Sequence, residues 1–105
     1  HVAAVSTTNS ITAGVARGSE RLFGGLRRGI GGAAITGRCL EELSMLHAIV
    51  RNAGHGLELI SVGGVMSAVD VRARLGAGAS NVQLATAPML DPMTGIRIRE
   101  QLRCS

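Results

Sequence analysis

Two short turns contain the residues with the clearest capacity for chemistry. In the first turn, Gly63 and Gly64 follow an apolar run and precede a helix predicted to begin near Ser67. Backbone N–H groups gather where a strand gives way to a helix, so an anion such as phosphate can bind there without a cationic side chain. Glycine suits the position because a side chain would block close approach and because such turns often need a positive φ. The spacing alone is equally typical of a turn that binds nothing.

The second turn contains Ala85 and Thr86 and follows the next predicted strand. It offers backbone donors and one hydroxyl group. If the predicted strands are the last three of an eight-stranded (β/α) barrel, the two turns are neighbours and follow strands seven and eight. Barrels most often bind phosphate at that place. The pair of turns therefore favours a phosphate site more than either turn does alone.

Strands and helices are predicted to alternate along the chain. The expected order is a strand at 2–5 with a polar tip at 6–10, a long glycine-rich loop at 11–37, a helix at 39–53, a strand at 57–62, a helix from Ser67 to Gly76, a strand at 79–85 and a short helix at 93–102. This alternation implies an α/β fold with parallel strands joined by right-handed crossovers. Part of a (β/α)8 barrel and part of an open doubly wound sheet both fit.

The two longer helices are predicted from apolar spacing and from a capping signal. Ser67 with Asp70 three residues later is close to a capping box. Val71 and Leu75 are expected to continue the apolar face of that helix. In the first helix the expected apolar face consists of Leu40, Leu43, Leu46, Ile49 and Val50.

Length and composition limit the chain to one domain and argue against nucleic-acid binding and against a membrane-spanning helix. The chain has 105 residues and a formal charge of +4, with eleven basic residues, all arginine. They are scattered apart from Arg27 and Arg28, which are expected to face solvent, and Phe23 is the one aromatic residue. Nucleic-acid binding is not expected, because rings for base stacking are lacking. The longest uncharged run, 75–90, contains polar residues and is too short for a membrane helix.

Cysteine and histidine give no sign of a disulfide framework or a metal site. Cys39 and Cys104 are far apart, and His1, His47 and His55 have no metal-ligand spacing with them. Cys39 is expected to be a partly buried structural thiol, His47 a residue of the helix surface and His55 a loop residue. This usage indicates a reducing, cytoplasmic setting. A start at His1 without a signal-peptide pattern suggests a position inside a longer protein.

Several blocks of the sequence resemble the C-terminal part of the dihydroorotate dehydrogenases, in order and spacing as well as in letters. The blocks are Thr-Asn-Ser-Ile at 8–11, Gly-Ile-Gly-Gly-Ala-Ala-Ile at 29–35, Ile-Ser-Val-Gly-Gly-Val at 60–65 with Asp70, and Ala-Gly-Ala-Ser-Asn-Val-Gln-Leu-Ala-Thr-Ala at 77–87. The resemblance covers nearly the whole chain. Ser61 departs from it, because glycine is common there in the family, as does Ala85, where glycine or tyrosine is common.

The resemblance implies an FMN-dependent enzyme on a (β/α)8 barrel that oxidises dihydroorotate to orotate in pyrimidine biosynthesis. Residues 1–105 would be one partial barrel domain, about strands 6–8. By position, the substrate-binding residues are Asn9 and Ser10, and the FMN-binding residues are Gly32, Gly63, Gly64, Ala85 and Thr86. The family's lysine beside the flavin and its catalytic Cys or Ser base belong to earlier barrel segments, so no catalytic residue is expected in this chain.

Other functions stay open at this point. The chain is expected to be inactive alone and to need its missing barrel half or a second copy, with a small pyrimidine as substrate. A non-catalytic module that binds phosphate or flavin is one alternative, and a dihydropyrimidine dehydrogenase-like domain is another. An inosine monophosphate dehydrogenase-like or hydroxy-acid oxidase-like barrel ranks behind these, because His55-Gly56 precedes a predicted strand instead of following one.

Overall fold

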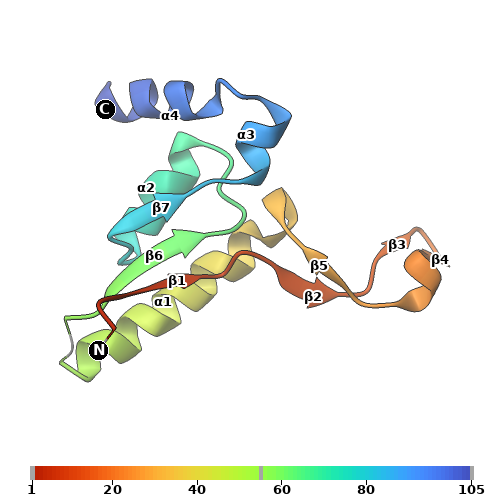
Figure 1. Cartoon of the computed structure of the whole chain (residues 1–105), viewed down its shortest axis with the longest axis horizontal. Coiled ribbons are helices and arrows are strands. Elements are labelled where there is room, and N and C mark those ends of the chain that lie inside the picture. Colours follow the sequence, from red (N-terminus) through yellow and green to blue (C-terminus); the bar gives the residue numbers. More distant parts are fainter. Residues whose placement is uncertain (1, 55, 105) are drawn as a thin grey trace.

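A computed structural model of the chain describes residues 2–54 and 56–104, so the predictions for His1 and His55 lie outside the described residues. Figure 1 shows a small sheet, helices packed against it, and an arm that extends to one side. The strands are β1 (Ala4–Thr7), β2 (Ile11–Ala13), β3 (Ala16–Arg17), β4 (Glu20–Arg21), β5 (Arg28–Ile30), β6 (Glu58–Val62) and β7 (Asn81–Gln83). The helices are α1 (Thr36–Asn52), α2 (Ala68–Gly76), α3 (Thr86–Leu90) and α4 (Thr94–Arg103), with 3-10 turns η1 (Phe23–Gly25) and η2 (Gly32–Ile35).

The central sheet has three parallel strands in the order β1-β6-β7. Thr7 pairs with Ser61 of β6, and Val62 pairs with Gln83 of β7. The predicted α/β fold with parallel pairing is thus confirmed, and the described residues form an open three-stranded segment without a closed barrel. Parallel strands place their carboxyl ends at one edge of the sheet, so the turns that follow β6 and β7 are neighbours.

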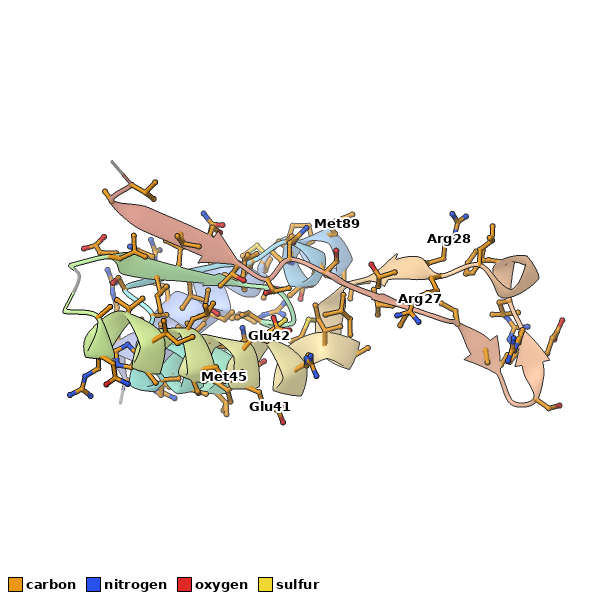
Figure 2. All side chains as sticks on the ribbon, turned by 90° about the horizontal axis from the view of Figure 1, so that it is seen from below. Arg27, Arg28, Glu41, Glu42, Met45 and Met89 are labelled. Carbon is orange, nitrogen blue, oxygen red and sulfur yellow. The ribbon has the colours of Figure 1, made fainter. Side chains whose placement is uncertain are left out.

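Helices α1 and α2 cover the same face of this sheet (Figure 2). Leu59 and Ser61 of β6 are two residues apart and therefore point to one face. Leu59 packs against Leu43 of α1 in a buried cluster that also contains Ala79. Ser61 accepts a hydrogen bond from Arg74 of α2. One strand thus fixes both helices relative to the turn at its carboxyl end.

The apolar faces of the helices differ in part from the predicted ones. In α1, Leu43 is 1% exposed, as predicted, but Ile49 is 61% exposed. In α2, Leu75 is 46% exposed whereas Arg74 is fully buried, so the prediction for Leu75 is wrong. The reason is helical geometry: Ala68, with residues 71 and 74, follows the three-residue spacing of one face, and residue 75 is rotated about 100° away from residue 74.

The start of α2 confirms the predicted capping box. Ser67 is the N-cap, and its side-chain oxygen accepts a hydrogen bond from the Asp70 backbone N–H at 3.4 Å. Asp70 Oδ2 in turn accepts from the backbone N–H groups of Ser67 at 3.1 Å and Met66 at 2.9 Å. These bonds satisfy donors that have no partner inside the helix.

Residues 11–37, predicted as a loop, instead form most of the arm. Strands β2 and β5 pair antiparallel, and β3 and β4 pair antiparallel near the tip (Figure 1). These strands have two or three residues each, too few to show the alternation by which a strand is recognised. Arg27 and Arg28 are exposed, as predicted, although Arg28 lies 5.0 Å from the centre of the Phe23 ring and Arg27 donates to the Thr12 carbonyl.

The C-terminal part contains one helix that was not expected. Thr86 was predicted to end a strand in a turn, but it begins α3, whose first turn tolerates Pro88. Helix α4 agrees with the predicted helix at 93–102 and buries Ile98 against Val65 and Val71. Among the described residues, every helix is too short or too polar to cross a membrane.

Candidate functional site

Six of the seven predicted site residues line one small pocket at the carboxyl edge of the sheet. The lining consists of Asn9, Gly32, Gly63, Gly64, Val65, Met66, Gln83, Ala85 and Thr86. Ser10 is outside this lining, and its hydroxyl lies instead beside Gly29, 3.6 Å from the place of an added β-carbon. The geometry brings the predicted residues together, and their roles toward substrate and cofactor stay predictions.

Three successive carbonyl groups at the end of β6 are held by three different parts of the chain. The Val62 carbonyl accepts from Thr8 N at 3.1 Å, the Gly63 carbonyl from Arg74 Nη2 at 2.9 Å, and the Gly64 carbonyl from Thr36 Oγ1 at 2.5 Å. The donors come from the end of β1, from α2 and from the first residue of α1. Tertiary contacts thus determine the orientation of each peptide group in this turn.

The same contacts determine where the N–H groups of the turn point. In a trans peptide the N–H group is directed opposite to the C=O group of the same peptide unit. With the three carbonyls bound as described, the N–H groups of Gly63, Gly64 and Val65 point away from those donors. None of the three donates a hydrogen bond within the described part of the chain. Consecutive free N–H groups beside a pocket form a concave site suited to an anion.

Glycine is required at this turn by the packing of the chain itself. Gly63 has φ +99° and Gly64 has φ +72°, in the region that side chains disfavour. A β-carbon on Gly63 would lie 1.9 Å from the Thr8 carbonyl oxygen, and one on Gly64 would lie 2.7 Å from Thr36 Cα. The two glycines therefore allow β1 and α1 to approach the turn, whether or not a ligand binds.

Gly32 and Thr86 form the opposite wall of the pocket. Gly32 begins η2 with φ +73°, and a β-carbon there would lie 3.1 Å from Thr86 Cγ2. This close approach joins the base of the arm to the turn that follows β7. The Thr86 hydroxyl makes no hydrogen bond to any part of residues 2–54 and 56–104, so it is available to a ligand.

Asp70 limits the free donors to the glycine turn. Its carboxylate already accepts from the N–H groups of Met66 and Ser67, the two residues that precede α2. The donors left for a ligand are therefore those of residues 63–65. Asn9 adds an exposed amide side chain on the link from β1 to β2. An amide group both donates and accepts, as recognition of a ring amide requires.

Beneath the turn lies Cys39, which is 2% exposed and therefore more buried than predicted. Its Sγ donates to the Thr8 carbonyl at 3.3 Å. Burial raises the pKa of this thiol, although the nearby Arg74 guanidinium opposes the shift. The sulfur is thus a neutral packing group. Among the described residues, no cluster of His, Cys, Asp and Glu could hold a metal ion.

Two polar residues of α1 have structural partners. Glu42 Oε2 accepts from Thr8 Oγ1 at 2.7 Å, and Glu42 also pairs with Arg38; these two contacts lower its pKa. Figure 2 shows Glu42 on the side of α1 nearer the sheet. His47, predicted on the helix surface, is half-buried because its ring packs against Gly78. The packing is so close that a β-carbon on Gly78 would lie 2.3 Å from the ring.

The sequence did not indicate three residues that shape the turn, Thr8, Thr36 and Arg74. Thr8 and Thr36 act through contacts that only the fold creates. Arg74 could have been found from its spacing, since it lies three residues after Val71 on the buried face of α2. A cation on an apolar face is unusual enough to indicate a buried partner.

Comparison with known proteins identifies the family of the chain. The sequence model of the family described as dihydroorotate dehydrogenase matches residues 1–104. A protein of Kocuria rhizophila is 46% identical over 76 residues, which is 71% of this chain and 20% of that protein. One of Pseudarthrobacter chlorophenolicus is 39% identical over 102 residues, 96% of this chain and 28% of that protein. Both are named dihydroorotate dehydrogenase (quinone).

A third relative with the same name, from Polynucleobacter necessarius, is 37% identical over 82 residues, 78% of this chain. The chain spans 20% to 28% of the length of these three relatives. The family-model match, over residues 1–104, includes the pocket and the strands that end at it. The chain belongs to the dihydroorotate dehydrogenase family.

Proposed function

We propose that residues 1–105 are the C-terminal part, about strands 6–8, of an FMN-dependent (β/α)8 barrel that oxidises dihydroorotate to orotate. The observation that carries this proposal is the set of three free N–H groups at residues 63–65, beside the Thr86 hydroxyl in one pocket. Family membership supplies the identity of the anion as the phosphate of FMN. The names of the relatives indicate a quinone as electron acceptor.

The donors of the pocket residues fit a phosphate group. Backbone N–H groups and a hydroxyl bind a phosphate without lysine, of which the chain has none. Gly63, Gly64 and Thr86 would hold the phosphate, with Ala85 contributing backbone. Gly32 would leave room for the flavin body where the arm joins the sheet.

The proposed division of roles follows the position of each residue. FMN, when bound, accepts the hydride that leaves dihydroorotate. Asn9 would bind and orient the polar edge of the pyrimidine, and Ser10 would reach the substrate when the rest of the site is present. No catalytic base is assigned to this chain. Its contribution is to hold the reactants in place, and that can supply a large part of a rate enhancement.

The open sheet indicates the partner that the chain requires. Strands β1 and β7 are both edge strands, and α1 and α2 cover only one face. Unpaired edges and an uncovered face are expected of a barrel segment whose other strands come from the missing barrel half or a second copy. We also propose that the protein acts in the cytoplasm, on a small-molecule substrate.

The first experiment measures whether the pocket recognises the phosphate of the cofactor. The 105-residue chain is titrated with FMN and with riboflavin, which lacks the phosphate, and flavin fluorescence is followed. Tighter binding of FMN by about tenfold is expected, because charged hydrogen bonds are worth about 1.5–3 kcal/mol. Equal binding of the two flavins would count against the phosphate site. If neither flavin binds, the chain needs the missing barrel half, and the same comparison is made on the chimera of the second experiment.

The second experiment tests the reaction. The chain replaces the aligned C-terminal segment of the Pseudarthrobacter chlorophenolicus relative, and dihydroorotate-dependent quinone reduction is measured. Activity is expected from this chimera and not from the 105-residue chain with FMN. A chimera that binds FMN but leaves dihydroorotate unreacted would show a module that binds flavin without catalysis. Turnover by the chain alone would contradict the assignment as a partial barrel.

A further inference from the structure

Arg74 of α2 is a fully buried cation at the back of the glycine turn. Its side chain is 0% exposed. Nη1 donates to Ser61 Oγ at 2.8 Å, and Nη2 donates to the carbonyls of Gly63 at 2.9 Å and Thr36 at 3.1 Å. The remaining nitrogen, Nε, is buried and has no hydrogen-bond partner among the described residues.

No carboxylate of the described residues forms an ion pair with Arg74. Both ion pairs within residues 2–54 and 56–104 lie elsewhere, between Arg38 and Glu42 and between Arg97 and Asp91. The three groups that accept from Arg74 are all neutral. A buried charge without a counter-charge is strongly unfavourable. Such an arrangement is expected where a bound anion completes the charge balance.

The guanidinium also determines the direction of one of the free donors. By holding the Gly63 carbonyl, Arg74 turns the N–H group of Gly64 the opposite way, since both belong to one trans peptide. Gly63 and Gly64 both line the pocket, and Arg74 does not. The charge of Arg74 therefore acts on the pocket from behind the glycine turn, and its hydrogen bond to the Gly63 carbonyl sets the direction of the Gly64 N–H group.

We propose that Arg74 is the positioning residue of the anion site: it orients the Gly64 N–H group toward the phosphate, and the phosphate in turn balances its buried charge. The inference rests on the proposed function, because that function supplies the anion. It adds a fixed cation to a site whose contacts are otherwise backbone groups and one hydroxyl. Arg74 thereby makes the pocket selective for a phosphorylated flavin over an uncharged one.

The test compares FMN with riboflavin in variants of the 105-residue chain. Arg74→Gln is expected to weaken FMN binding about tenfold and riboflavin binding less than about twofold, since only FMN carries the charge. Arg74→Lys keeps the charge and is expected to keep a preference for FMN. Arg72→Gln is the matched control, because Arg72 is exposed on the same helix and, within residues 2–54 and 56–104, donates only to the Gln101 carbonyl.

The outcomes separate this inference from the proposed function. If Arg74→Gln weakens both flavins equally, Arg74 is only structural and the inference is overturned, while the phosphate site stands. If the unmutated chain does not prefer FMN to riboflavin, the proposed function fails and the inference fails with it. A loss of FMN preference in Arg72→Gln equal to that in Arg74→Gln would also overturn the inference, because net charge alone would explain both.

A measurement on the unmutated chain covers the case in which Arg74→Gln does not fold. Inorganic phosphate is added to a 15N-labelled chain, and the NMR signals of the Gly64 amide and of Arg74 Nε–H are followed. Both signals are expected to shift with the same midpoint. A Gly64 amide that shifts while the Arg74 signal stays unchanged would overturn the inference.

Discussion

The carbonyl oxygen of Thr8 lies 1.9 Å from the point that a β-carbon on Gly63 would occupy. Thr8 also donates its N–H to the Val62 carbonyl. Thr8 therefore contacts the end of β6 through both its N–H group and its carbonyl group. Contact this close leaves no room for any side chain at position 63. The turn therefore depends on glycine for the assembly of the sheet edge as well as for its own conformation.

Gly63→Ala is expected to lower the free energy of unfolding by about 3 kcal/mol or more, since it combines a backbone clash with a disfavoured positive φ. Urea denaturation followed by circular dichroism measures the change. Gly95→Ala is the control, because Gly95 lies in α4 with no atom within 4 Å of an added β-carbon. Equal stability of the two variants would contradict the role of glycine described above.

Asp70→Ala is expected to lower stability by about 1–2 kcal/mol, because the N–H groups of Met66 and Ser67 lose their acceptor. Thermal melting monitored at 222 nm would measure this loss. Glu41→Ala, an exposed change on α1, serves as the comparison and is expected to be nearly neutral. If the two melts coincide, the capping box contributes nothing measurable.

Thr86→Val removes the free hydroxyl of the pocket while keeping the shape of the side chain that packs on Gly32. FMN affinity is expected to fall about fivefold, the value of one hydrogen bond of about 1 kcal/mol, with riboflavin affinity unchanged. Fluorescence titration checks both. Thr12→Val on the exposed face of the arm is the control. An unaltered FMN affinity would remove Thr86 from the phosphate site.

The two cysteines are expected to differ in reactivity. Cys104 is exposed and should react quickly with a thiol reagent such as Ellman's, whereas Cys39 is buried and has a raised pKa, so it should react only as the chain unfolds. Counting modified thiols with and without urea tests this. Two thiols that react at equal rates in the folded chain would contradict the buried position of Cys39.

The raised pKa of Cys39 also predicts a pH dependence. A group whose pKa is higher in the folded chain stabilises the fold below its unfolded pKa, near ~8.5, and that contribution is lost as pH rises through the folded value. As pH rises above about 8.5, stability should therefore fall more steeply in the unmutated chain than in Cys39→Ala. Parallel pH profiles of the two chains would count against this cause.

Features with a local signal could be predicted from the sequence. The capping pair Ser67 and Asp70 and the alternation of strands with longer helices both appear in short windows, and both agree with the structure. The arm could not be predicted in the same way, because its strands of two or three residues owe their existence to cross-strand pairing. Helix α3 was not predicted because the apolar residues around Val82 and Leu84 favour a strand up to residue 85, and a five-residue helix is too short to show a helical period of its own.

The pocket could be predicted as a set of residues but not as a structure. Strand order and family resemblance indicate that Gly63, Gly64 and Thr86 lie at one sheet edge. The groups that orient the turn come from elsewhere, and Arg74 was overlooked because arginine is usually expected at the surface. Its burial depends on Ser61 and on two backbone carbonyls, which become acceptors only after the chain has folded.

The three carbonyls at the end of β6 are bound by β1, α1 and α2, and this has an energetic consequence. Free donors at residues 63–65 exist only while all three elements are in place, so the site and the tertiary structure form in one equilibrium. A ligand that binds only the assembled form must stabilise it, by an amount set by its concentration relative to its dissociation constant. Under the proposed function, FMN would thus also stabilise the folded chain, because it would bind the sheet edge only in its assembled form.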